Sequence, residues 1–124
     1  MSKISVIGAG SVGATIANDL MIQGTASEIV LVDINKQKAF GEALDIYQGA
    51  PFCSPAIVRS GDYAATAGSD IVVITSGMPR KAGQSRLDLA QANVNIIKDI
   101  APQVVKAAPN AKYVIVSNPV DVLT

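Results

Sequence analysis

The sequence predicts an α/β domain built around a doubly wound parallel sheet of about five strands. Short runs rich in valine and isoleucine alternate with longer segments of helical periodicity, which is the order of strand–helix–strand units. The chain has 124 residues, the length of one domain, and 49% of them are hydrophobic while 16% are charged. This composition is typical of a chain that buries parallel strands.

The apolar runs place the expected strands at residues 4–7, 28–32, 56–59, 70–75 and 112–117, of which the third is the weakest. Three helices are expected between them, with apolar stripes formed by Val12, Ile16 and Leu20, by Phe40, Leu44 and Tyr47, and by Val94, Ile97, Ala101, Val104 and Ala108. Gly24 is a stop signal for the first helix. We expect Pro102 to kink or break the third, because proline has no N–H to donate to the carbonyl four residues earlier.

Charge and residue usage exclude several classes of function. Ten basic and ten acidic residues give a net charge of zero, so nothing in the overall charge favours nucleic acid or an anionic membrane. One cysteine and no histidine argue against a disulfide framework or a conventional transition-metal site, and they fit a cytoplasmic protein. No apolar run reaches the roughly 18 residues of a membrane span. Residues 4–18 are uncharged and also resemble a signal-peptide core, but their three glycines favour a strand and a turn.

A glycine-rich segment, Gly8-Ala9-Gly10-Ser11-Val12-Gly13, follows the first expected strand and opens the first helix. In this context Gly8 permits a tight turn, Gly10 lets a pyrophosphate approach the backbone, and Gly13 allows the helix to pack closely on the strand. Amides at the helix N-terminus would hold the phosphates. The alternative is a glycine turn that serves packing alone.

The aspartate at the end of the second expected strand indicates which dinucleotide is bound. Asp33 follows Gly13 by twenty residues, where a carboxylate accepts hydrogen bonds from the adenosine ribose hydroxyls. The same carboxylate would repel a 2′-phosphate, and no arginine follows it at Ile34 or Asn35. NAD is therefore expected rather than NADP, although Lys36 lies close enough to contact a 2′-phosphate.

Two arginines, Arg80 and Arg86, lie between the fourth expected strand and the third expected helix. A guanidinium group binds a carboxylate through two parallel hydrogen bonds and stays charged at physiological pH. Gly77 and Gly83 would give this loop the freedom of a lid over an anionic substrate. The alternative is a pair of solvated surface arginines.

Other polar residues carry weaker signals. Asn118 ends the fifth expected strand at the sheet edge where open α/β sheets bind ligands, or it forms a simple turn with Pro119. Glu42 and Asp45 are expected to form a solvated or subunit-facing patch. Cys53 has no neighbour that would hold it as a thiolate, so we expect it to be packed.

Taken in order along the chain, these segments closely resemble the lactate and malate dehydrogenase family. The resemblance is carried by residues 8–13, Asp33, 76–81, 85–89, Asn93 and 116–121. It implies a Rossmann-type domain that binds NAD through the glycine turn, Asp33 and Asn93, with backbone contacts at Ser76, Gly77, Val116 and Ser117. It also implies a cis bond before Pro119.

The resemblance further implies a substrate and its ligands. Arg86 matches the catalytic residue that polarises the substrate carbonyl, and Asn118 matches a residue that touches both nicotinamide and substrate. Arg80 occupies the position that selects the substrate, where glutamine is typical of lactate enzymes and arginine of malate enzymes. The family likeness therefore points to an NAD-dependent malate dehydrogenase, an oxidoreductase of the tricarboxylic acid cycle.

Family members are longer than this chain, so residues 1–124 are expected to form the dinucleotide-binding domain without the sixth strand or the substrate domain. The histidine that exchanges the substrate proton in the family has no counterpart here. We therefore expect cofactor binding with little or no turnover. The alternatives are a half-enzyme completed by a second chain, and a non-catalytic module that self-associates through exposed apolar surfaces.

Overall fold

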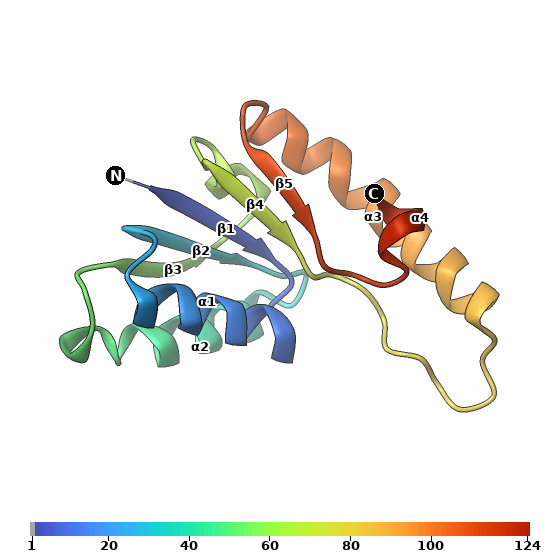
Figure 1. The fold of residues 1–124 in the computed structure, drawn as a ribbon, viewed down its shortest axis with the longest axis horizontal. Coiled ribbons are helices and arrows are strands. Elements are labelled where there is room, and N and C mark those ends of the chain that lie inside the picture. The colour runs from blue at the N-terminus through green and yellow to red at the C-terminus, as the bar shows by residue number, and fades with distance from the viewer. Residues whose placement is uncertain (1) are drawn as a thin grey trace.

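The computed structural model describes residues 2–124, and its centre is a sheet of five parallel strands in the order β3-β2-β1-β4-β5 (Figure 1). This confirms the predicted α/β class. The elements in chain order are β1 (Lys3–Ile7), α1 (Ser11–Gln23), β2 (Glu28–Val32), α2 (Lys36–Tyr47), the short 3-10 helix η1 (Ala50–Phe52), β3 (Ile57–Gly61), the 3-10 helix η2 (Tyr63–Thr66), β4 (Ile71–Ile74), α3 (Arg86–Ala107), β5 (Lys112–Ile115) and α4 (Val120–Leu123).

The sheet is covered by helices on both faces. The central strand β1 pairs with β2 and β4, so that Val6 lies beside Leu31 and Val73. These three side chains pack with α1 and α2 on one face. On the other face, Ile100 and Val104 of α3 pack against the alternate residues of the same strands. Alternation along each buried strand therefore builds two cores from one sheet.

The packed faces of the first two helices differ from the expected stripes. Val12 is 54% exposed, Ile16 and Leu20 are half-buried, and the whole stripe of Phe40, Leu44 and Tyr47 on α2 is exposed. The buried residues are instead Gly13, Ala17 and Met21 on α1 and Ala39, Ala43 and Ile46 on α2. Most of these residues are small, and small residues let a helix lie close to the sheet. The face of each helix that packs on the sheet is therefore the one with small side chains and not the one with the largest apolar side chains.

Helix α3 follows the prediction at its end, where Val104 and Ala108 are buried as expected. Of the kink or break expected at Pro102, the break is excluded, because the helix runs without interruption from Arg86 to Ala107. Pro102 and Lys98, one turn earlier, are both exposed. Because proline has no N–H, the backbone carbonyl of Lys98 lacks its usual hydrogen bond within the helix. That carbonyl therefore lies on the side of the helix that faces water.

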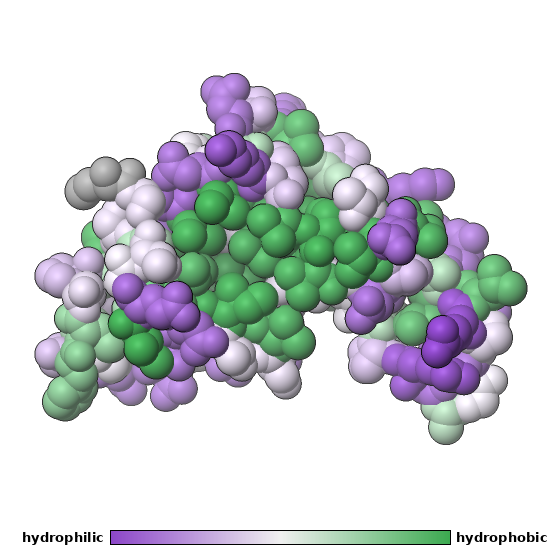
Figure 2. Space-filling view, viewed as in Figure 1, coloured by the Kyte–Doolittle hydropathy of each residue, from purple (hydrophilic) through white to green (hydrophobic). Residues whose placement is uncertain are grey.

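Strand β5 forms one edge of the described sheet and leaves apolar surface uncovered. Val114 of β5 pairs with Val73 of β4, whose side chain packs in the core on the face that α1 covers. At the edge of that same face, Val114 is 46% exposed. Figure 2 shows the result as an apolar band across the middle of this face of the molecule. Unpaired backbone groups and exposed apolar side chains therefore lie together along this edge of the described sheet.

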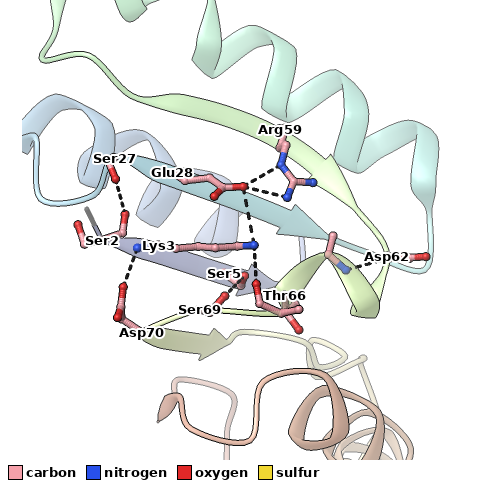
Figure 3. A network of polar contacts seen from close by, with 12 residues as sticks. Ser2, Lys3, Ser5, Ser27, Glu28, Arg59, Asp62, Thr66, Ser69 and Asp70 are labelled. Carbon is pink, nitrogen blue, oxygen red and sulfur yellow. Dashed lines mark hydrogen bonds and ion pairs between the residues drawn. The ribbon is translucent and has the colours of Figure 1, made fainter.

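A polar network ties the amino ends of the strands together (Figure 3). Glu28 of β2 accepts from Arg59 of β3 at 2.8 and 2.9 Å and lies 3.8 Å from the ammonium group of Lys3 on β1. The backbone N–H of Lys3 donates to the carboxylate of Asp70 at 2.8 Å, just before β4. These contacts fix the register at one end of the sheet and leave the carboxyl ends of the strands free for a site.

Candidate functional site

A groove of about 1040 Å³ lies at the carboxyl ends of the strands. It is the position at which open α/β sheets bind ligands. The expected site residues that line it are Gly8, Gly10, Ser11, Val12, Gly13, Asp33, Ser76, Gly77, Arg80, Asn93, Val116, Ser117 and Asn118. Ala9 and Arg86 are the expected site residues outside its lining.

The glycine turn between β1 and α1 forms the floor of the groove. Gly8 has a φ of 107°, a conformation that side chains disfavour, and a Cβ there would lie 2.7 Å from Oγ1 of Thr75. A Cβ on Gly13 would overlap the carbonyl oxygen of Gly8. Gly10 differs, because a Cβ built on it would meet nothing within 4 Å. Gly8 and Gly13 are therefore required by the fold, whereas the space beside Gly10 is open to a ligand.

The N-terminus of α1 begins at this open space. Its N-cap is Gly10, and no side chain in residues 2–124 caps it. The first amides of the helix consequently point into the groove with the positive end of the helix dipole behind them. Such an end is suited to a phosphate group, so the geometry fits the pyrophosphate expected from the sequence.

Asp33 is held in place by the backbone at the end of β2. One carboxylate oxygen accepts the N–H of Ala9 at 2.8 Å, and the other accepts the N–H of Asn35 at 2.8 Å. Ala9 is fully buried, so its contribution to the site is this hydrogen bond. Each carboxylate oxygen has a further lone pair, and Asp33 remains half-buried at the groove wall, where it can accept from a ribose hydroxyl.

A buried asparagine joins the two loops at the other end of the groove. Asn93 on α3 is 2% exposed, accepts the N–H of Met78 at 2.8 Å and donates to the carbonyl of Asn118 at 2.7 Å. Ser117 donates from its hydroxyl to the carbonyl of Ser76 at 2.6 Å. The segments after β4 and β5 are thus held together, and the peptide bond before Pro119 is cis, which confirms that expectation.

The arginine loop occupies the stretch between β4 and α3. Arg80 lines the groove and donates from Nε to the carbonyl of Gln84 at 3.0 Å, which folds the loop back on itself. Arg86 is the first residue of α3 and is exposed outside the groove. In this conformation the two guanidinium groups therefore do not share one pocket.

The start of α3 is closed by a capping box. The hydroxyl of Ser85 accepts from the N–H of Asp88 at 3.1 Å, and the carboxylate of Asp88 accepts from the N–H of Ser85 at 3.2 Å. Hydrogen bonds from Ser85 to the carboxylate, first from its hydroxyl and then from its N–H, hold the pKa of Asp88 below its ordinary value. The cap fixes where the loop ends and the helix begins.

One end of the groove is lined by residues that the sequence did not single out. Tyr63 of η2, Lys38 of α2, and Ile96, Asp99 and Ile100 of α3 also line it. Burial raises the pKa of Tyr63, and the negative charges of Asp99 and Asp33 raise it further. The signal that could have identified Tyr63 is its place just after the third strand, since the carboxyl ends of all parallel strands meet at this edge.

Within residues 2–124, no three histidine, cysteine, aspartate or glutamate residues lie close enough to hold a metal ion. No helix in this part of the chain is long and apolar enough to cross a membrane. Cys53 is half-buried against the α1 and α2 core, as expected of a packed residue.

Comparisons with known proteins all identify the same family. Residues 2–124 match the model for "lactate/malate dehydrogenase, NAD binding domain". The chain is 58% identical to L-lactate dehydrogenase 1 of Clostridium acetobutylicum and 59% identical to an L-lactate dehydrogenase of Clostridium botulinum. In each case 99% of this chain aligns with 39% of the relative, so the chain spans about two fifths of the length of these relatives.

Solved structures of both kinds of enzyme have the same fold. The malate dehydrogenase of Archaeoglobus fulgidus in complex with NADH superposes with a TM-score of 0.91 at 45% identity, over 98% of this chain and 42% of that one. The apo malate dehydrogenase of Picrophilus torridus gives 0.91 at 42% identity, over 98% and 40%. A lactate dehydrogenase from a Medee basin deep-sea metagenome library gives 0.89 at 38% identity, over 95% and 38%.

Proposed function

The chain belongs to the lactate/malate dehydrogenase family and forms its NAD-binding domain, and from this premise we propose that it serves the NAD-dependent interconversion of malate and oxaloacetate. Bound NAD(H) would supply or accept the hydride at the nicotinamide. The chain's own residues would bind and orient the cofactor and the substrate, and they would polarise the reacting carbonyl. Arg80 in the groove wall is the observation that carries the choice of malate.

The cofactor is assigned to the groove at the carboxyl ends of the strands. Backbone amides at Gly10, Ser11, Val12 and Gly13 are suited to the pyrophosphate, because α1 starts there without a side-chain cap. Asp33 would accept from the ribose. The nicotinamide end is assigned to the joined loops of Ser76, Gly77, Asn93, Val116, Ser117 and Asn118.

Substrate recognition is assigned to the arginine loop. Arg80 would pair in two hydrogen bonds with the distal carboxylate of oxaloacetate, an acceptor that pyruvate lacks. Arg86 would polarise the reacting carbonyl once the loop moves toward the groove, since it is exposed outside it in this conformation. Asn118, at the groove wall, would hydrogen-bond the substrate.

Lactate is the second candidate substrate. The identity of 58–59% to L-lactate dehydrogenases favours it, whereas the charge of Arg80 favours a dicarboxylate. The test is Arg80→Gln in the full-length protein, with the ratio of kcat/KM for oxaloacetate to that for pyruvate as the readout. We expect the ratio to fall by at least about tenfold. An unchanged ratio would remove Arg80 from substrate selection.

The proton-transfer group is expected to come from outside these 124 residues, because the chain contains no histidine. Oxaloacetate-dependent oxidation of NADH by the purified chain should therefore be slow or undetectable. Robust turnover would contradict this assignment. We also propose a cytoplasmic location, in keeping with the single half-buried cysteine.

Self-association is a further candidate property of the chain, favoured by the exposed apolar band at β5. Light scattering tests it directly. A monomer at micromolar concentration that binds NADH would count against an assembly role.

A further inference from the structure

The groove has a second end beyond Asp33 that differs in chemistry from the rest. It is formed by Ile34 after β2, by Tyr63 of η2, and by Ile96, Asp99 and Ile100 on one stretch of α3. Helix α3 packs directly on η2, so these residues belong to one wall. Isoleucine and tyrosine side chains suit the flat apolar faces of a nucleobase. Asp99 is the charged residue in this otherwise largely apolar wall.

Asp99 is available to a ligand. Its carboxylate makes no hydrogen bond or ion pair with other residues in the described part of the chain, although its backbone carbonyl accepts from the side chain of Gln103. Asp99 and Tyr63 both line the groove, and the negative charge of Asp99 raises the pKa of Tyr63. An ionised carboxylate is an acceptor and never a donor, so it discriminates between ligand groups by whether they offer an N–H or an oxygen.

The order of the strands decides which part of a dinucleotide reaches this wall. The pyrophosphate seat at Gly10 lies at β1, in the middle of the sheet, and the joined loops around Asn118 lie on the β4 and β5 side. Asp33 and Tyr63 follow β2 and β3 on the opposite side. If the nicotinamide occupies one side, the adenosine occupies the other, with its base beyond the ribose at Asp33.

We infer that Asp99 is a specificity-determining residue, whose carboxylate selects adenine by accepting a hydrogen bond from the 6-amino group of the cofactor base. This inference rests on the proposed cofactor site. A base with an oxygen at position 6 would place an acceptor against an acceptor. A site built to hydrogen-bond a donor rejects the analogue without one, because its own polar group is then left unpaired.

Two cofactors that differ at this edge of the base test the inference without a mutation. Isothermal titration calorimetry of the 124-residue chain would compare NADH with reduced nicotinamide hypoxanthine dinucleotide, in which oxygen replaces the 6-amino group and N1 carries a hydrogen. We expect NADH to bind about fivefold more tightly, the value of one partly exposed hydrogen bond to a charged acceptor. Equal affinities for the two would overturn the role of Asp99.

A variant of Asp99 then tests whether this residue causes the difference in affinity between the two cofactors. Asp99→Asn can turn an amide N–H toward the oxygen, so the affinity ratio should fall to within about twofold. Asp45→Asn is the matched control, since it makes the same charge change on exposed α2 surface outside the groove, and it should keep the native ratio. A native ratio in Asp99→Asn would contradict the inference. If neither cofactor binds the native chain, the proposed cofactor site fails as well.

Discussion

Three glycine-to-alanine variants separate the residues that the fold requires from the residue that the ligand requires. In Gly10→Ala the new Cβ meets no atom within 4 Å, and the φ of −74° and ψ of −175° suit alanine. Alanine is a poorer N-cap than glycine, so we expect a loss of at most about 1 kcal/mol in the free energy of unfolding. The methyl group would nevertheless fill the open space assigned to the pyrophosphate, and the NADH affinity should fall by at least about tenfold, or about 1.4 kcal/mol.

Gly13→Ala should behave in the opposite way. Its Cβ would overlap the carbonyl oxygen of Gly8 and lie 2.9 Å from Oγ1 of Thr75, and neither the turn nor β4 can yield easily. Overpacking of this kind costs about 1–3 kcal/mol or more. The expected result is a clear loss of unfolding free energy, with weaker NADH binding as a consequence of the distorted turn.

Gly41→Ala is the matched control on the exposed side of α2. A Cβ there also meets nothing within 4 Å, and alanine in a helix interior is favoured over glycine by about 0.5–1 kcal/mol. We expect a small gain in stability and native NADH affinity. Urea unfolding followed by circular dichroism and calorimetric NADH titration would be measured on all three variants. Native binding by Gly10→Ala, or native stability of Gly13→Ala, would refute this account of the turn.

Further predictions concern the polar groups around the groove. Asn93→Leu removes a buried amide that joins two loops, so the unfolding free energy should fall by about 1–3 kcal/mol and NADH should bind more weakly; native values in urea unfolding and titration would contradict the bridge. The pKa of Asp88 is lowered in the fold, so its contribution is present above the ordinary value of 3.8 and lost as the pH falls through the lower folded value. Ser85→Ala should abolish that acid-dependent loss in stability measured across pH. The pKa of Tyr63 is raised above its ordinary value of 10.0, so its contribution to stability is present below that pH and is lost as the pH rises through the folded value. Burial also raises the pKa of Tyr113, so ultraviolet titration should show two late-ionising tyrosines, of which Tyr63→Phe removes one.

The sheet and the glycine turn could be predicted because their signals are local. Each strand is a short β-branched run, and the turn carries glycines where the backbone conformation or close packing demands them, as at Gly8 and Gly13. Asp33 could be located because it follows a strand directly.

The packed helix faces and the second end of the groove could not be read in the same way. On α2 the sequence offers both an aromatic stripe at Phe40 and a small-residue stripe at Ala39, and only the distance to the sheet decides which is buried. Tyr63 and Asp99 are 36 positions apart in the sequence and meet because α3 packs on η2. Such a contact depends on tertiary structure, which no local pattern encodes.

The most direct test of the central claim is a titration of the 124-residue chain with NADH, with NADPH as the control. Asp33 lines the groove next to the glycine turn and accepts the N–H of Ala9, and its charge opposes a 2′-phosphate. We expect saturable binding of NADH and markedly weaker binding of NADPH. A folded chain that binds no NADH, or that binds NADPH equally well, would contradict this expectation.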